Sequence, residues 1–168
     1  MKHFLNSFRY AMGGIVFCVK YERNMRIHIA MTMYVLYFAS FYDFTRAEII
    51  LLILTCVSAV TLEMVNTAIE VVIDKVFPNY HTLAKIGKDV AAGAVLIATI
   101  AAVFIGVFLF WEPSVFVDIW LYFSGSMLKG LMFLGSLMLA FLFINSGKKR
   151  KARIRKKVEE SEEKKNEK

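Results

Sequence analysis

The hydrophobic residues of this chain are gathered into four long stretches separated by short charged segments. A helix that crosses the ~30 Å hydrocarbon core of a bilayer needs about 20 apolar residues. One stretch has 22 residues without a charge, and another is interrupted only by Lys129. The stretches are Ile27–Tyr42, Ile49–Leu62 (continued to Ile69 apart from Glu63 and Asn66), Val90–Trp111 and Ile119–Asn145. This pattern predicts an all-helical membrane protein with four spanning helices.

The first 26 residues show a different pattern. Five apolar residues recur at helical spacing and fall within about 80° of one another on a helix, with polar residues elsewhere. They are Phe4, Phe8, Met12, Ile15 and Val19. We therefore expect residues 1–26 to form an amphipathic helix on the cytoplasmic surface of the membrane. The alternative is a helix that packs on the protein without touching lipid.

Composition agrees with a membrane protein and excludes several other classes. Hydrophobic residues make up 58% of the 168 residues, charged residues 21%, and the mean hydropathy is +0.54. The net charge of +7 belongs to the C-terminal end, because residues 148–168 hold 11 of the 21 basic residues and residues 1–147 carry only +1. This distribution argues against a nucleic-acid partner. Cys18 and Cys56 stand in apolar surroundings, which excludes a disulfide scaffold and predicts unreactive thiols.

Basic residues beside the predicted spans indicate how the chain is oriented. Lys and Arg are concentrated in residues 1–26, in the connection between the second and third stretches, and in residues 148–157. The other two connections hold few of them. Because basic segments stay on the cytoplasmic side of a membrane, four spans with both termini in the cytoplasm agree best with the sequence.

Polar residues interrupt the second apolar stretch at helical spacing. Glu63, Glu70 and Asp74 lie within about 40° of one another on a helix, with Asn66 beside them; these four residues are called the polar stripe. A carboxylate inside a membrane costs at least ~2.5 kcal/mol, so the stripe needs partners. Three interpretations are open: hydrogen-bonded contact between helices, a path for ions or protons, or a site that holds a divalent cation and a polar substrate.

Two further clusters lie on the same predicted side of the membrane. Glu22 and Arg26 are one helical turn apart before the first stretch, and Lys85, Lys88 and Asp89 precede the third. Carboxylates bind Mg²⁺ and lysines bind phosphate oxygens, which are the groups that phosphoryl transfer uses. The sequence has neither a Walker A motif nor G-x-G-x-x-G. A nucleotide would therefore bind on helix surfaces rather than in a glycine-rich loop.

These residues resemble the signature of a known family. The chain contains Glu63-x-x-Asn66-Thr-Ala-Ile-Glu70-x-x-x-Asp74, then Tyr80-His81, then Ala84-Lys85-x-x-Lys88-Asp89-x-Ala-Ala. Over about residues 5–112, this order is similar to that of the small bacterial integral-membrane lipid kinases, the diacylglycerol kinase and undecaprenol kinase family. Upstream, Glu22-Arg23-Asn24-Met25-Arg26-Ile27-His28 resembles the segment found in Gram-positive members.

The resemblance implies an ATP-dependent lipid kinase of the bacterial cytoplasmic membrane that assembles as a homotrimer. Residues 27–113 would form a three-span kinase core behind the surface helix. By position, Glu63 corresponds to the catalytic general base, and Glu22 and Glu70 correspond to the Mg²⁺ ligands. Asn66 and Asp74 match essential polar positions of the catalytic site. The residues that match the family's ATP contacts are Tyr10, Glu22, Glu70, Asn79, Tyr80, His81, Lys88 and Asp89.

The resemblance also bears on the acceptor. The segment of residues 22–28 favours undecaprenol, which direct in-line transfer from MgATP would convert to undecaprenyl phosphate. Diacylglycerol, giving phosphatidic acid, is the alternative acceptor. A non-enzymatic conduit for ions or protons, built on the polar stripe, is a remote alternative.

Residues 114–168 depart from the family pattern. We expect an additional membrane helix in residues 114–147 and a charged cytoplasmic tail without fixed structure in residues 148–168. The basic residues of the tail are of the kind that binds anionic lipid headgroups. Residues 114–168 contain no His, which argues against a fused lipid phosphatase that depends on histidine.

Overall fold

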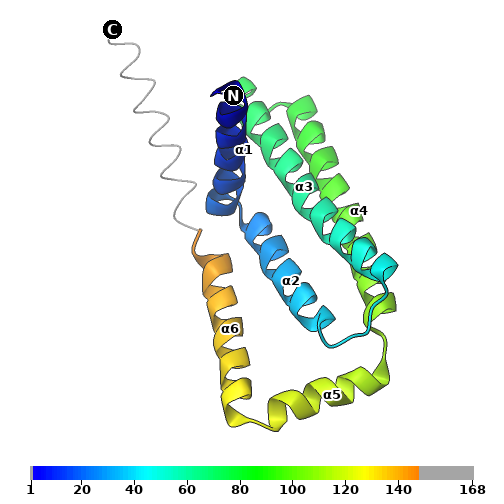
Figure 1. Cartoon of the computed structure of the whole chain (residues 1–168). Coiled ribbons are helices and arrows are strands. Elements are labelled where there is room, and N and C mark those ends of the chain that lie inside the picture. The colour runs from blue at the N-terminus through cyan, green and yellow to red at the C-terminus, as the bar shows by residue number, and fades with distance from the viewer. Residues whose placement is uncertain (1, 148–168) are drawn as a thin grey trace.

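The computed structural model describes residues 2–147 and shows six helices joined by short connections within that range (Figure 1). In chain order they are α1 (Lys2–Tyr21), α2 (Arg23–Ala39), α3 (Arg46–Val76), α4 (Thr82–Phe110), α5 (Pro113–Ser124) and α6 (Met127–Asn145). This part of the chain holds no strand, so the all-helical prediction is confirmed. The tail predicted for residues 148–168, and its binding to lipid, lie outside the described residues.

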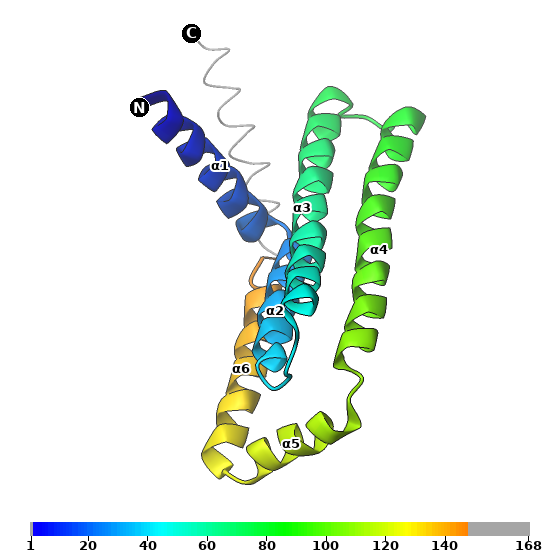
Figure 2. The same cartoon turned by 45° about the vertical axis from the view of Figure 1, so that its right-hand side comes forward.

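Helices α3 and α4 form a long hairpin (Figures 1 and 2). A capping box begins α3, in which the Glu48 N–H donates to the Thr45 hydroxyl oxygen and the Thr45 N–H donates to the Glu48 carboxylate at 2.8 Å. The helices have 31 and 29 residues. Each is therefore more than ~40 Å long and exceeds the ~30 Å hydrocarbon core. The loop end of the hairpin extends beyond the neighbouring ends of α2 and α6 (Figure 1).

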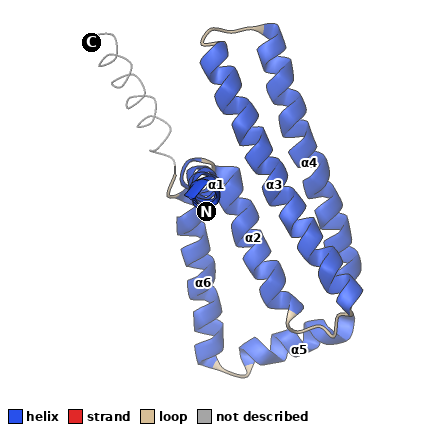
Figure 3. Cartoon of the chain, turned by 45° about the horizontal axis from the view of Figure 1, so that its top comes forward, coloured by secondary structure: helices blue, strands red, loops and turns tan. Residues whose placement is uncertain are grey.

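Helix α2 lies between α3 and α6 (Figure 3). The sequence predicts a helix from Ile27, but α2 begins earlier, at Arg23, and includes Met25 and Arg26, which are both buried. Within residues 2–147, three helices are long and apolar enough to cross a membrane, namely α3, α4 and α6. Helix α2 has 17 residues and is shorter than these.

The fourth apolar stretch differs from the prediction of a single helix over Ile119–Asn145. Residues Gly125 and Ser126 separate α5 from α6. The Gly125 N–H closes the last turn of α5, and Ser126 has the extended backbone of a residue that precedes a helix. Helix α5 crosses the end of the bundle, and α6 returns alongside α2 (Figure 1). The additional C-terminal membrane helix is confirmed, but it consists of the 19-residue α6 alone.

Helix α1 extends away from the other helices (Figure 2), and the apolar residues along most of its length are exposed. Phe4 is 77% exposed and Phe8 is 63% exposed, whereas Cys18, near the end of the helix, is buried. An uncovered apolar face is what a helix on a lipid surface requires. The helix predicted at the N-terminus is confirmed, although it ends at Tyr21 rather than at residue 26, and its place on the membrane surface stays a prediction.

Candidate active site

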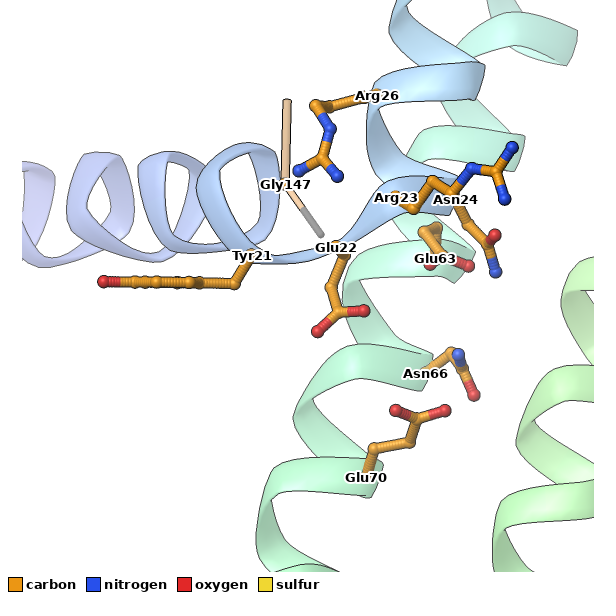
Figure 4. Close-up of a pocket in the computed structure, with 9 residues that line it drawn as sticks. All are labelled: Tyr21, Glu22, Arg23, Asn24, Arg26, Glu63, Asn66, Glu70 and Gly147. Atoms are coloured by element: carbon orange, nitrogen blue, oxygen red, sulfur yellow. The ribbon is translucent and has the colours of Figure 1, made fainter. Parts of the chain in front are cut away.

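The chain turns at Glu22, the residue between α1 and α2. The Glu22 backbone is extended, with φ −102° and ψ 125°, and its N–H donates to the Cys18 carbonyl at 2.8 Å. Helix α1 therefore leaves sideways from α2, as Figure 4 shows. This corner brings the Glu22 side chain next to α3, which carries the polar stripe.

Three residues of the polar stripe share a pocket with Glu22. The pocket has a volume of about 310 Å³ and lies where α1, α2 and α3 meet (Figure 4). Glu63 is 1% exposed and Asn66 is 6% exposed, whereas Glu70 is half-buried. The residues lining the pocket are Tyr21, Glu22, Arg23, Asn24, Arg26, Glu63, Asn66, Glu70 and Gly147. Three carboxylates thus gather with two guanidinium groups at one end of α2.

The oxygen atoms in this pocket suit a hard divalent cation. Figure 4 shows the carboxylates of Glu22 and Glu70 pointing into the space beside Asn66. The buried Oδ1 atom of Asn66 accepts no hydrogen bond from the part of the chain that the structure describes. Among residues 2–147, no group of three or more His, Cys, Asp or Glu residues is arranged to hold a metal by itself. Because Mg²⁺ is usually held by one or two carboxylates together with phosphates and water, these residues fit Mg²⁺ that arrives with a nucleotide.

Arg26 closes one side of the pocket and joins the ends of two helices. Its side chain is 2% exposed. Its Nη1 donates to the carbonyls of Val19 at 3.0 Å and Lys20 at 3.4 Å, and its Nε donates to the carbonyl of Ile144 at 3.2 Å. The last carbonyls of a helix carry partial negative charge and attract cations. Arg26 therefore caps α1 and α6 together and fixes the corner that presents Glu22.

The hairpin end carries two ion pairs. Lys88 of α4 pairs with Asp74, the last residue of the polar stripe. Lys85 pairs with Asp89 at 3.0 Å, one turn along α4. Asp74 and Asp89 are exposed, so these pairs are open to water. Neither pair lines the pocket with Glu22.

The other residues predicted to contact ATP are exposed. Tyr80 is 82% exposed, and His81 precedes α4 with its ring 4.7 Å from that of Phe77. Asn79 stands in the same connection, and Tyr10 lies on α1 with 75% of its surface exposed. The structure thus brings Glu22, Glu63, Asn66 and Glu70 together, and leaves the remaining predicted residues outside that pocket.

Cys18 lies beside the same corner and is 5% exposed. Burial raises the pKa of its thiol, and the carboxylates of Glu22 and Glu63 raise this pKa further. A hydrogen bond with the Thr67 side chain acts in the opposite direction. Cys18 is thus buried, as its apolar surroundings in the sequence indicate, whereas Cys56 is only half-buried.

A family model described as prokaryotic diacylglycerol kinase matches residues 9–110, which is more than half of the chain. The chain belongs to this family. The matched region contains α2, α3 and α4 and nearly all of the polar residues described above. The family resemblance expected from the sequence is therefore confirmed.

Several named lipid kinases are similar to this chain. A diacylglycerol kinase of Synechocystis sp. is 44% identical over 110 residues, which is 65% of this chain and 63% of that protein. An undecaprenol kinase of Bacillus subtilis is 34% identical over 110 residues, covering 66% of this chain and 89% of that protein. A diacylglycerol kinase of Pseudomonas aeruginosa is 30% identical over 98 residues. This chain thus spans less than two thirds of the length of the Synechocystis relative. No solved structure matches the chain.

The pocket also contains residues that the sequence did not assign to the site. Arg26 stands one turn after Glu22 in the sequence, but its bond to the end of α6 depends on a contact across 118 positions of the chain. Gly147 lines the pocket from the end of α6, beyond the matched region. Only one sequence feature pointed to Arg26. It is a basic residue one helical turn after the carboxylate of Glu22, at the border of an apolar helix.

Proposed function

We propose that this chain transfers the γ-phosphoryl group of ATP to the hydroxyl group of a membrane lipid alcohol. The observation that carries this proposal is the burial of Glu63 in a pocket that it shares with Glu22 and Glu70. A buried carboxylate in a candidate membrane span is costly and is retained mainly where it has a function. Membership of the prokaryotic diacylglycerol kinase family supports the same chemistry.

Glu63 is the proposed general base. It precedes Glu70 by seven residues on α3, so it lies about 10 Å deeper along the helix. A lipid hydroxyl held at the membrane surface can reach this depth while a nucleotide stays on the cytoplasmic side. The Glu63 carboxylate accepts the hydroxyl proton as the lipid oxygen bonds to the γ-phosphorus. The bond between that phosphorus and the β,γ-bridging oxygen breaks, and ADP leaves.

Glu22 and Glu70 are the proposed Mg²⁺ ligands, with the buried Asn66 Oδ1 facing the same space. When bound, Mg²⁺ would neutralise charge on the nucleotide phosphates. The corner between α1 and α2 places the Glu22 carboxylate against Glu70, which lies on α3. Arg26 fixes that corner through its bonds to Val19 and Lys20.

The hairpin end and α1 carry the proposed nucleotide contacts. Lys88 supplies a positive charge for phosphate oxygens, and its pairing with Asp74 fixes where that charge lies. We further assign ATP contacts to Asp89 and to the exposed residues of the hairpin connection and α1, namely Asn79, Tyr80, His81 and Tyr10. Because these residues are exposed, a nucleotide can reach them from water.

The proposed acceptor is diacylglycerol, in place of the undecaprenol that residues 22–28 favour. The relative with 44% identity is named a diacylglycerol kinase, whereas the undecaprenol kinase is 34% identical. Undecaprenol remains the second candidate, because the match to that kinase covers 89% of its length. Both acceptors offer a hydroxyl group on a hydrocarbon anchor, so the same pocket chemistry serves either.

Four crossings with both termini in the cytoplasm are the proposed topology. Arg26, near the start of α2, donates to the carbonyl of Ile144, near the end of α6. A chain that returns to the side it started from must cross the membrane an even number of times. Helices α3, α4 and α6 are three candidate spans, so α2 supplies the fourth despite its 17 residues.

The homotrimer implied by the resemblance is part of the same proposal, and light scattering of the purified protein in detergent tests it.

A direct comparison of two lipids tests the proposed reaction. The full chain, purified in mixed micelles, receives γ-labelled ATP and either dioleoylglycerol or undecaprenol. We expect label in phosphatidic acid, with slower or no labelling of undecaprenol. Preferential labelling of undecaprenol would change the proposed acceptor but leave the proposed kinase activity in place. Ion flux in proteoliposomes, with no lipid-dependent ATP consumption, would overturn the kinase proposal in favour of a conduit.

A further inference from the structure

A second cavity separates α2 from α5 and α6. Its volume is about 530 Å³, which is within the range of ligand sites. Apolar side chains dominate its walls, including Met33 of α2 and Met132, Ala140 and Phe143 of α6. One wall belongs to α5 and α6, which lie outside the region that matches the family model. The cavity is therefore built in part by the C-terminal extension of this chain.

This apolar groove ends one helical turn from the candidate active site, and the buried Arg26 side chain lies between the two. Ala30 lines the groove on α2, one helical turn after Arg26, which lines the polar pocket. On α6, Phe143 lines the groove one turn before Gly147, which also lines the polar pocket. The two cavities thus lie end to end along the contact between α2 and α6.

The groove is about as long as a hydrocarbon chain in one leaflet of a bilayer, and it lies at the depth of such chains. Its α6 residues run from Lys129 to Phe143, which corresponds to about 20 Å along the helix. Helix α6 is a candidate membrane span, so the groove lies within the bilayer.

The polar groups in the groove are few and are paired with one another. The Tyr34 hydroxyl donates to the Ser136 hydroxyl oxygen at 3.2 Å. The Lys129 amine lies 3.7 Å from the centre of the Tyr122 ring, at the end of the groove away from Arg26. The rest of the groove offers dispersion contacts to an apolar chain. A polar headgroup therefore finds more polar partners beyond the end of the groove, where the pocket that contains Glu63 lies.

We propose that this groove holds one hydrocarbon chain of the acceptor lipid and thereby delivers its hydroxyl group to Glu63. The inference rests on the proposed kinase function and adds a subsite for the acceptor chain. Bulk phospholipid makes similar apolar contacts, but the end of the groove lies one helical turn from the pocket, which favours a lipid whose headgroup is the reacting alcohol. The subsite makes α6 a determinant of acceptor chain preference.

Substitutions on α6 test the subsite. Ala140→Phe places a ring in the groove, whereas Gly135→Phe places one on an open face of the same helix, where a Cβ would meet nothing within 4 Å. With dioleoylglycerol, Ala140→Phe should raise KM about tenfold through lost dispersion contacts. With dihexanoylglycerol, and for the KM of ATP, both variants should match the unsubstituted protein. An equal KM for dioleoylglycerol in the two variants would overturn the subsite.

Photolabelling of the unsubstituted chain gives a second test that does not depend on a variant folding. A diacylglycerol with a diazirine on one acyl chain should label α2 and α6, and dioleoylglycerol should compete while dioleoylphosphatidylcholine should not. Equal competition by both lipids would mean that bulk phospholipid fills the groove and would overturn the proposal. A second outcome would also overturn the proposal: no label on α2 or α6, together with a change of oligomer size in Ala140→Phe. A second copy of the chain would then fill the groove. Failure of the unsubstituted chain to phosphorylate any lipid would instead reject the kinase function.

Discussion

Replacement of Arg26 should open the corner at which α1 joins the other helices. Arg26→Met keeps an unbranched apolar stem but removes the guanidinium that donates to Val19 and Lys20 of α1. Both bonds come from one nitrogen, and the bond at 3.4 Å is long, so we count them as one hydrogen bond from a charged group. Such a bond contributes about 1.5–3 kcal/mol. Because methionine also avoids the cost of burying a charge, we expect the lower value, about 1.5 kcal/mol, which raises the open population about tenfold.

The buried thiol of Cys18 reports this opening. Cys18 lies one residue before Val19 and is 5% exposed, so a water-soluble maleimide reaches it only when the end of α1 separates from α3. In a Cys56→Ala background, which leaves Cys18 as the single thiol, Arg26→Met should increase the labelling rate about tenfold. Arg9→Met, on the exposed part of α1, is the control and should leave the rate unchanged. Equal labelling of Arg26→Met and its parent would show that Arg26 does not hold this corner.

Three further outcomes are expected. Because burial raises the pKa of the Cys18 thiol, maleimide labelling of Cys18 should begin at higher pH than labelling of a peptide thiol. For the same reason, the stability of the protein should fall as pH rises through this raised pKa. Melting curves recorded from neutral to alkaline pH check this second effect. Thr45→Ala removes the hydroxyl of the capping box and should cost about 1 kcal/mol of stability, measured as a lower melting temperature than Thr45→Ser. EDTA should abolish phosphoryl transfer and added Mg²⁺ should restore it; transfer that persists in EDTA would contradict the roles of Glu22 and Glu70.

The sequence predicted the polar stripe because helical spacing is a local property. Glu63, Asn66 and Glu70 do share one pocket, as their spacing on α3 indicates. Asp74 has the same spacing but lies outside that pocket, because the loop end of the hairpin extends beyond the neighbouring end of α2 and Lys88 pairs with Asp74 there. Spacing gives the direction of a side chain from its own helix, but it does not state which helix stands opposite.

Contacts between distant segments explain what the sequence did not predict. The bond from Arg26 to Ile144 joins residues 118 positions apart and depends on the path of α5, which no local pattern specifies. The break at Gly125 and Ser126 did carry a local signal. Continuous apolar residues on both sides concealed it, since hydropathy alone does not distinguish one long helix from two that meet at a turn.

The Glu63→Gln variant tests the central claim most directly. Glutamine keeps the size of the side chain but cannot accept the hydroxyl proton, so turnover should fall by about 10²–10⁴-fold while the melting temperature changes little. Glu48→Gln, at the start of the same helix, preserves a capping-box residue and should keep full activity. The measurement is the kcat for transfer of γ-labelled phosphate to dioleoylglycerol. Near-normal turnover in Glu63→Gln would contradict the account, because the buried carboxylate would then not be the base.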